Sequence, residues 1–108
     1  MDDVVVVLTT VPTGSKGDEI GRTLVEERLA ACVNVLAPMT SIYRWRGAVE
    51  RESEQQLIIK TTRTRVPALQ ARLAALHPYE LPEFVVVAGA DSSAPYLDWI
   101  VESTSEEK

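Results

Sequence analysis

A cluster of polar side chains lies in the segment HPYELPEF, which begins at His77. The imidazole of His77 is followed by the phenol of Tyr79, and Glu80 and Glu83 add two carboxylates. These groups can exchange protons or bind a cation. Lys60 ends the apolar run LIIK, where an ammonium group is costly to bury unless it meets a carboxylate or an anionic ligand. We therefore predict a polar cleft in which Lys60 lies close to Tyr79 and Glu80, ion-paired or facing a ligand.

Few residues in the sequence can bind a soft metal. Thiolate and imidazole are the ligands that copper prefers, and the chain has one cysteine, Cys32, and one histidine, His77. These two residues are the predicted copper ligands. Cys32 falls at the end of a predicted apolar helix face, where a thiol is usually inert, which argues against a Cys–His nucleophile pair. The alternative for His77 is a structural role, as the C-terminal cap of a helix.

Three carboxylates, Glu50, Glu52 and Glu54, alternate along a predicted strand and so share one of its faces. They can bind a hard cation weakly, although a solvated acidic face is the simpler interpretation. Standard catalytic signatures are absent from the sequence, which contains no GxSxG, P-loop, GxGxxG, HExxH or CxxC motif. The sequence therefore predicts a protein that is not a conventional enzyme.

A long β-hairpin over residues 31–62 is predicted to position these side chains. Gly47 marks its reversal, and Pro38 implies a bulge or an edge within the first arm. Each arm has roughly 13 residues and reaches about 43 Å at ~3.3 Å per residue. No helix of this chain can cover such a ribbon, so part of it overhangs and exposes backbone groups that favour pairing with another chain. Tyr43 and Trp45 share one face near its tip and are expected to line an interface or a cleft.

The remaining elements predict an α+β fold in a single domain of residues 1–108. Their order matches the ferredoxin-like βαββαβ arrangement, an antiparallel sheet with helices on one face, followed by an extra C-terminal helix. The expected elements outside the hairpin are a strand over Val4–Leu8, a loop over Thr9–Gly17, a helix from an Asp18 cap to Ala31, a helix from Pro67 to His77, a central strand over Phe84–Ala88 and a helix that begins at Pro95 after a Ser92 or Ser93 cap. Tyr96, Trp99 and Ile100 are expected on one face of the last helix.

The composition of the sequence indicates which partners and which cellular compartment to expect. The net charge of −5 disfavours nucleic acid as a partner, because nucleic-acid binding needs a positive surface. No apolar run approaches the ~18 residues of a membrane span. A single cysteine suits a reducing compartment, and Asp2 and Asp3 stand where a secretory signal would be basic. We therefore expect a cytoplasmic protein.

The sequence resembles the CutA family of divalent-cation tolerance proteins. The order and spacing of the matching stretches are specific, and together they cover most of the chain. These stretches are LAACVN from Leu29, SIYRWRG from Ser41, ExxxExxLIIKT from Glu50, HPYELPE from His77 and YLDWI from Tyr96.

The resemblance implies a homotrimer similar to the PII signalling proteins, with the long hairpins interlocking the subunits. It also implies a role in tolerance of copper and other divalent metals, with no established reaction and no required cofactor, and with copper or another small ligand bound at clefts between subunits. The cleft residues carried over from the family are Tyr43, Trp45, Lys60, His77, Tyr79 and Glu80, and Cys32 matches the family's ACVN. The alternative is an acylphosphatase-like hydrolase on the same fold. That chemistry needs a glycine-rich anion loop with an arginine near the first strand, and TTVPTGSKG has no arginine.

Overall fold

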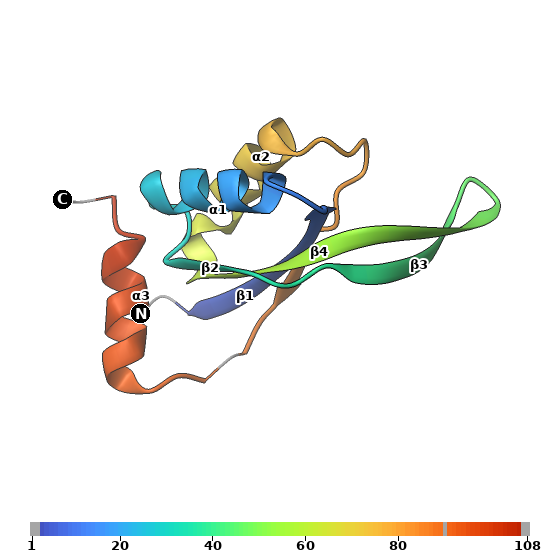
Figure 1. The fold of residues 1–108 in the computed structure, drawn as a ribbon. Helices are drawn as coiled ribbons and strands as arrows, with labels where there is room; N and C mark the ends of the chain where they lie inside the picture. Colours follow the sequence, from blue (N-terminus) through green and yellow to red (C-terminus); the bar gives the residue numbers. More distant parts are fainter. Residues whose placement is uncertain (1–2, 90, 107–108) are drawn as a thin grey trace.

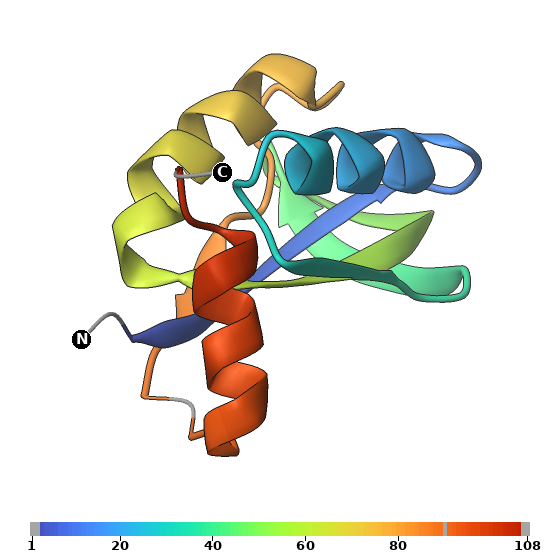
Figure 2. The same ribbon diagram turned by 90° about the vertical axis from the view of Figure 1, so that its left-hand side faces the viewer.

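The computed structural model describes residues 3–89 and 91–106. Within these residues, five strands form one sheet in the order β2-β4-β1-β5, with β3 also paired to β4, and every pairing is antiparallel. Helices α1 and α2 lie on one face of the sheet, and α3 packs at the end away from the hairpin (Figures 1 and 2). The elements are β1 (Val4–Pro12), α1 (Lys16–Glu26), β2 (Cys32–Val35), β3 (Met39–Trp45), β4 (Ala48–Thr62), a 3-10 turn (Arg63–Arg65), α2 (Val66–Leu76), β5 (Val85–Val87) and α3 (Ala94–Ser103). The predicted ferredoxin-like α+β fold with an added C-terminal helix is confirmed.

The hydrophobic core lies between the sheet and the two helices that cover it. Alternate residues of β1 and β4 point toward α1 and α2, as the two-residue period of a strand requires. Each fully buried aliphatic side chain contributes about 1.5–3 kcal/mol to the free energy of unfolding. The largest fully buried aliphatic residues are Val5, Val7, Val11, Ile20, Leu24, Leu57, Ile59, Leu69, Leu73 and Ile100. Gly21 brings α1 close to the sheet, because a Cβ there would lie 3.1 Å from Cγ1 of Val33.

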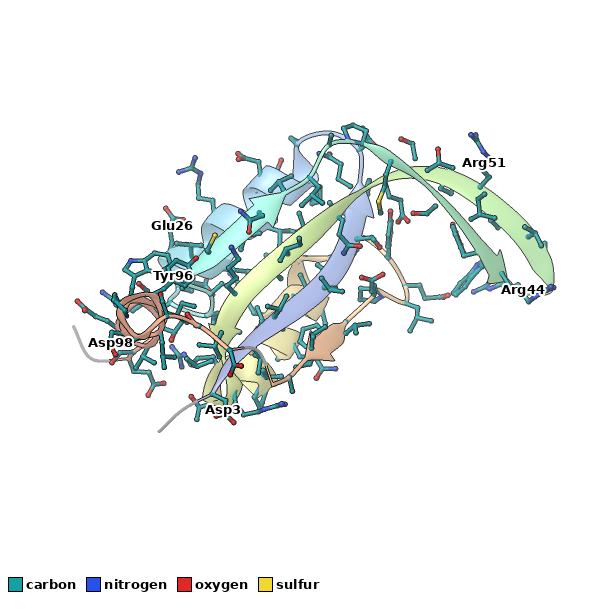
Figure 3. All side chains as sticks on the ribbon, turned by 90° about the horizontal axis from the view of Figure 1, so that it is seen from below. Asp3, Glu26, Arg44, Arg51, Tyr96 and Asp98 are labelled. Atoms are coloured by element: carbon teal, nitrogen blue, oxygen red, sulfur yellow. The ribbon has the colours of Figure 1, made fainter. Side chains whose placement is uncertain are left out.

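The hairpin of β3 and β4 closes through a two-residue turn at Arg46 and Gly47, whose φ angles are 50° and 83°. Two successive positive φ angles make this a type I′ turn, which matches the twist of the strands it joins. The predicted reversal at Gly47 is confirmed. The hairpin extends well beyond α1 and α2 (Figure 1), and Figure 3 places Arg44 and Arg51 in its outer part.

The first arm of the hairpin is interrupted at Pro38, as predicted. Val35 pairs with Leu57 and Met39 pairs with Glu54, so three residues of the first arm oppose two of β4. One extra residue on one strand is a β-bulge, which bends the strand. The bulge divides the first arm into β2, beside the core, and β3, on the overhang.

The first helix and the loop before it differ from the prediction. Strand β1 stays paired with β4 as far as Pro12, so the connection to α1 is much shorter than expected. Helix α1 then begins at Lys16 after Ser15, and Asp18 lies in its first turn rather than at the cap. The helix ends at Glu26 because Arg28 adopts a φ of 62°.

Two further expectations are wrong, because α1 ends at Glu26 before it reaches Cys32 and because β5 joins the sheet beside β1 at one end of the strand order. Cys32 begins β2 instead of ending a helix face. Strand β5 has only three residues and lies at the edge of the sheet instead of its centre, so Val85 and Val87 remain 49% and 45% exposed.

Helix α3 begins as predicted, with Ser93 as its N-cap and Pro95 in its first turn. Its aromatic residues are not part of the core. Ile100 is buried, whereas Tyr96 and Trp99 are exposed and lie against each other with ring centroids 5.3 Å apart. Among the described residues, no helix combines the length and the apolar composition needed to cross a bilayer.

Candidate functional site

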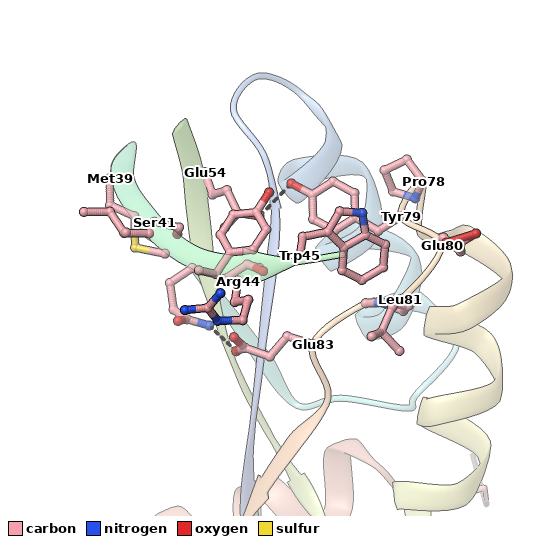
Figure 4. Close-up of a pocket in the computed structure, with 15 residues that line it drawn as sticks. Met39, Ser41, Arg44, Trp45, Glu54, Pro78, Tyr79, Glu80, Leu81 and Glu83 are labelled. Atoms are coloured by element: carbon pink, nitrogen blue, oxygen red, sulfur yellow. Dashed lines mark hydrogen bonds between the residues drawn. The ribbon is translucent and has the colours of Figure 1, made fainter. Parts of the chain in front are cut away.

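An open cavity of about 910 Å³ lies between the hairpin and the segment 78–83, which connects α2 to β5 (Figure 4). One wall comes from β3, including Tyr43 and Trp45, and the floor includes Glu54 and Gln56 of β4. Residues 78–83 form the opposite wall. Four predicted cleft residues, Tyr43, Trp45, Tyr79 and Glu80, therefore line one cavity.

His77 lies behind this cavity and holds the 78–83 segment in place. Its backbone N–H caps α2 by donating to Leu73 O at 2.8 Å. Its ring Nε2 lies 2.7 Å from the carbonyl oxygen of Thr10 and must donate to it. Its Nδ1 accepts the Tyr79 N–H at 3.1 Å. Both ring nitrogens are thus occupied, and the side chain is 8% exposed, so His77 positions Tyr79 and does not line the cavity.

Tyr79 and Glu54 form a part-buried polar contact in the cavity. The Tyr79 hydroxyl donates to Oε2 of Glu54 at 2.7 Å, and Glu54 is 7% exposed (Figure 4). Burial, followed by the hydrogen bond and charge of Glu54, raises the pKa of Tyr79 well above its ordinary value. The pKa of Tyr43 is raised by burial and then by three carboxylates of β4, the largest effect coming from Glu52. Three carboxylates of β4 thus place negative charge near the Tyr43 hydroxyl at this end of the sheet.

Arg46, which sequence reasoning missed, joins the hairpin turn to the opposite wall. Its Nη2 lies 2.6 Å from Oε2 of Glu80, and its guanidinium carbon lies 5.2 Å from the centroid of the Trp45 ring. Both charged side chains are about 70% exposed, so the ion pair contributes at most about 1 kcal/mol. The sequence offered one indication that Arg46 could belong to the site, which is its position in the turn between Trp45 and Gly47.

Gln56 is a second residue that the sequence did not single out. Its amide Nε2 donates to Thr9 O at 2.6 Å and to Oε2 of Glu83 at 3.1 Å. It therefore links β1 to the far wall of the cavity. No motif marks this role, because it depends on which residue lies next to Gln56 across the sheet.

Lys60 lies outside the cavity, and the predicted contact with Glu80 is wrong within the chain. Lys60 is six residues along β4 from Glu54, about 20 Å at ~3.3 Å per residue. Its Nζ lies 5.9 Å from the Tyr96 ring of α3, at the end of the sheet opposite the hairpin (Figure 3). Glu80 pairs with Arg46 instead, because the length of β4 separates its two ends.

The two predicted metal ligands do not come together within one chain. Cys32 pairs with Lys60, which in turn pairs with Val6 of β1, whereas His77 contacts Thr10, four residues farther along β1. The Cys32 thiol makes a long hydrogen bond, 3.8 Å, to Oδ1 of Asn34. In the described part of the chain, no three His, Cys, Asp or Glu side chains lie close enough together to hold a metal ion.

The connection between β1 and α1 is not built as an anion loop. The N–H of Gly14, which such a loop would point at a phosphate, donates to Oε1 of Gln55 at 3.0 Å. The Thr13 hydroxyl is hydrogen-bonded to the hydroxyl of Ser53 at 2.9 Å. The loop is tied to β4, so the geometry does not favour the acylphosphatase-like alternative.

Comparison with known protein families identifies the family of this chain. The sequence model described as CutA1 divalent ion tolerance protein matches residues 5–103. This chain belongs to the CutA1 family. The resemblance noted in the sequence is confirmed.

Similar proteins span bacteria, plants and animals. The chain is 50% identical over 99 residues to the divalent-cation tolerance protein CutA of Thermus thermophilus, covering 92% of this chain and 96% of that protein. It is 42% identical over 95 residues to Protein CutA of Mus musculus, covering 88% of this chain and 54% of the mouse protein. The crystal structure of CutA from Xylella fastidiosa matches with a TM-score of 0.91 at 44% identity, covering 95% of this chain and 99% of that one. The names of these CutA relatives describe divalent-cation tolerance or the family alone, and none states a reaction.

Proposed function

We propose that this CutA1 family chain is a small homotrimeric protein of divalent-cation tolerance. It acts in the cytoplasm by binding copper or another small ligand at clefts between subunits, in the manner of a PII-like binding or signalling protein. The observation that carries this proposal is the overhanging hairpin. Ile42 and Val49, near its tip, are 68% and 66% exposed, which serves no purpose in a monomer. The divalent-cation tolerance named for its relatives supports the link to metal.

The cavity beside the hairpin supports the position of the cleft. It opens along β3, and the free edge of β3 is available to a second chain. A subunit that pairs with this edge would close the open side of the cavity. The ligand site would then be complete only in the assembled protein.

Copper binding is expected to be modest, because Cys32 and His77 are far apart in the fold. A site that uses both needs ligands from two subunits, and His77 would have to give up a hydrogen bond to Thr10 or Tyr79. Cys32 is the better candidate, since its thiol is only loosely engaged.

Calorimetric titration of metal-free protein with Cu²⁺ and Zn²⁺ tests the copper proposal. We expect Cys32→Ala to weaken Cu²⁺ binding by at least tenfold, and Glu50→Gln, on the acidic strand face, to leave it within twofold. His77→Gln retains a donor for Thr10 and tests the imidazole separately. Unchanged Cu²⁺ affinity in the double variant Cys32→Ala/His77→Gln would contradict the assignment of these ligands.

A further inference from the structure

We propose that the cavity between the hairpin and the 78–83 segment binds a small organic cation of the guanidinium type. This inference concerns the cleft of the proposed function and names the chemical class of its ligand. It rests on the aromatic walls, on a buried carboxylate that forms no ion pair with any described residue, and on the contacts that Arg46 already makes at the site.

The walls of the cavity carry aromatic rings on both sides. Tyr43 and Trp45 of β3 line one side, and Tyr79 lies on the opposite wall. Figure 4 shows Trp45 and Tyr79. Aromatic faces attract cations through their quadrupole, and a planar guanidinium can also stack on them. The cavity therefore suits a cation with a flat, weakly hydrated charge better than an anion.

Glu54 supplies a negative charge that no side chain of the described residues neutralises. It is 7% exposed, its side chain accepts the Tyr79 hydroxyl, and each ion pair found among these residues involves another carboxylate. A buried carboxylate is costly unless a cation or several donors compensate it. Glu54 lines the cavity, so a bound cation can supply the missing charge.

The other charged groups of the cavity leave it negative. Glu80 is paired with Arg46, so the remaining lining charges are Glu54 and Glu83 against Arg44. The pKa of Tyr43 is raised first by burial and then by the charges of Glu52, Glu54 and Glu50, which is consistent with these negative lining charges. A hard metal ion fits the cavity less well, because Ca²⁺ and Mg²⁺ need about six or more oxygen ligands and the described residues offer no cluster of three acidic or imidazole groups.

Arg46 shows how the ligand would be held. Its guanidinium lies 5.2 Å from the Trp45 ring and reaches both Glu80 oxygens, at 2.6 and 3.3 Å. An aromatic ring and a carboxylate thus already hold a guanidinium at the rim of the cavity. Because Arg46 uses Trp45 and Glu80, it competes with an external cation, and its removal is expected to strengthen binding.

Calorimetric titration of the metal-free, 108-residue protein with n-butylguanidinium tests the proposal, with uncharged, nearly isosteric n-butylurea as the matched ligand. We expect n-butylguanidinium to bind at least tenfold more tightly than n-butylurea. Glu54→Gln should weaken its binding at least tenfold, and Glu26→Gln, exposed on α1, should leave it within twofold. Arg46→Met should strengthen it about threefold or more, and Arg51→Met, which removes the same charge elsewhere on the hairpin, should change it less.

Thermal denaturation and the sedimentation mass of each variant confirm that it retains the native fold and assembly. If Glu54→Gln does not retain them, the comparison of the two ligands and the Arg46→Met variant decide the question. Equal affinity for n-butylguanidinium and n-butylurea, or no binding of either, would overturn the inference. The second result would mean that the cavity is filled in the assembled protein. A trimer that binds Cu²⁺ but no guanidinium would leave the proposed function intact and refute only the ligand class.

Discussion

Three hydrogen bonds in series hold the far wall of the cavity. The His77 ring donates to Thr10 on β1 and accepts from the Tyr79 N–H, and the Tyr79 hydroxyl donates to Glu54 on β4. The first bond fixes His77 against β1, the second ties Tyr79 to His77, and the third fixes Tyr79 against β4. The contact between Tyr79 and Glu54 requires a protonated Tyr79 hydroxyl. A phenolate there would be buried and repelled by the Glu54 carboxylate.

The raised pKa of Tyr79 predicts a loss of stability at alkaline pH. Below about pH 10 the phenol is protonated in both the folded and the unfolded chain, so its contribution to the free energy of unfolding is fully present. Above about pH 10 the unfolded phenol ionises first, and the free energy of unfolding falls by up to about 1.4 kcal/mol per pH unit until the folded phenol ionises. Urea denaturation at a series of alkaline pH values measures this slope. Tyr79→Phe should flatten it and Tyr96→Phe, on α3, should not; the same slope in both variants would contradict the prediction.

Helix α1 ends through a backbone conformation that an arginine adopts at some cost. The N–H of Arg28 donates to Val25 O at 3.0 Å and that of Leu29 to Leu24 O at 2.9 Å, the pattern of a Schellman motif. Arg28 occupies the position with φ of 62°, where glycine is usual. Its carbonyl accepts the Nε of Arg65 at 3.2 Å, a bond that does not depend on the Arg28 side chain.

We therefore expect Arg28→Gly to raise the free energy of unfolding by about 0.5–1 kcal/mol, because glycine adopts this conformation without strain. Arg22→Gly is the matched control. It removes the same side chain from the exposed middle of α1, where glycine should cost about 1 kcal/mol. Chemical denaturation of the two variants gives the comparison, and a loss of stability in both would show that the Arg28 side chain matters more than its backbone.

The hairpin gives the whole molecule its elongated shape. The chain extends 44 Å along its longest axis and 25 and 24 Å along the others. Strand β4 has 15 residues. Among the described residues, its inner half pairs with β1 and β2, and its outer half pairs with β3 alone. Two strands alone are marginally stable in water, so the outer half needs further partners.

We predict that the protein assembles through the hairpin, and the CutA resemblance sets the expected mass at three subunits in sedimentation equilibrium at low micromolar concentration. Replacing residues 42–49 by a short turn should give aggregated or unfolded protein, because the interface is lost. A milder change, Ile42→Ser with Val49→Ser, should shift the mass toward one subunit. The control Val25→Ser, on the outer face of α1, should keep it at three. A shortened chain that stays folded and monomeric would show that the hairpin is not an interface.

Local patterns were enough to predict most elements of this fold. The hairpin, its bulge and the start of α3 were predicted correctly because their signals are local. These signals are the alternation of apolar residues, Gly47, Pro38 and Pro95, and each determines the conformation of only a few neighbouring residues. Errors arose where local signals were ambiguous. An arginine at position 28 does not indicate a left-handed backbone conformation. The three consecutive valines of β5 fit an edge strand and a central strand equally well.

The contacts between the residues of the cavity depend on how strands distant in the sequence pair with one another. Tyr43, Trp45, Tyr79 and Glu80 were assigned to one cleft by resemblance, and the fold places them around one cavity. The partners of its charged groups were not predicted, because they are set by the pairing of β4 with β1 and β3. That pairing brings Glu54 to Tyr79 and Arg46 to Glu80, and it carries Lys60 to the other end of the sheet. A one-residue shift in register would turn each strand side chain to the opposite face, and no short sequence pattern records which residues face each other across a sheet.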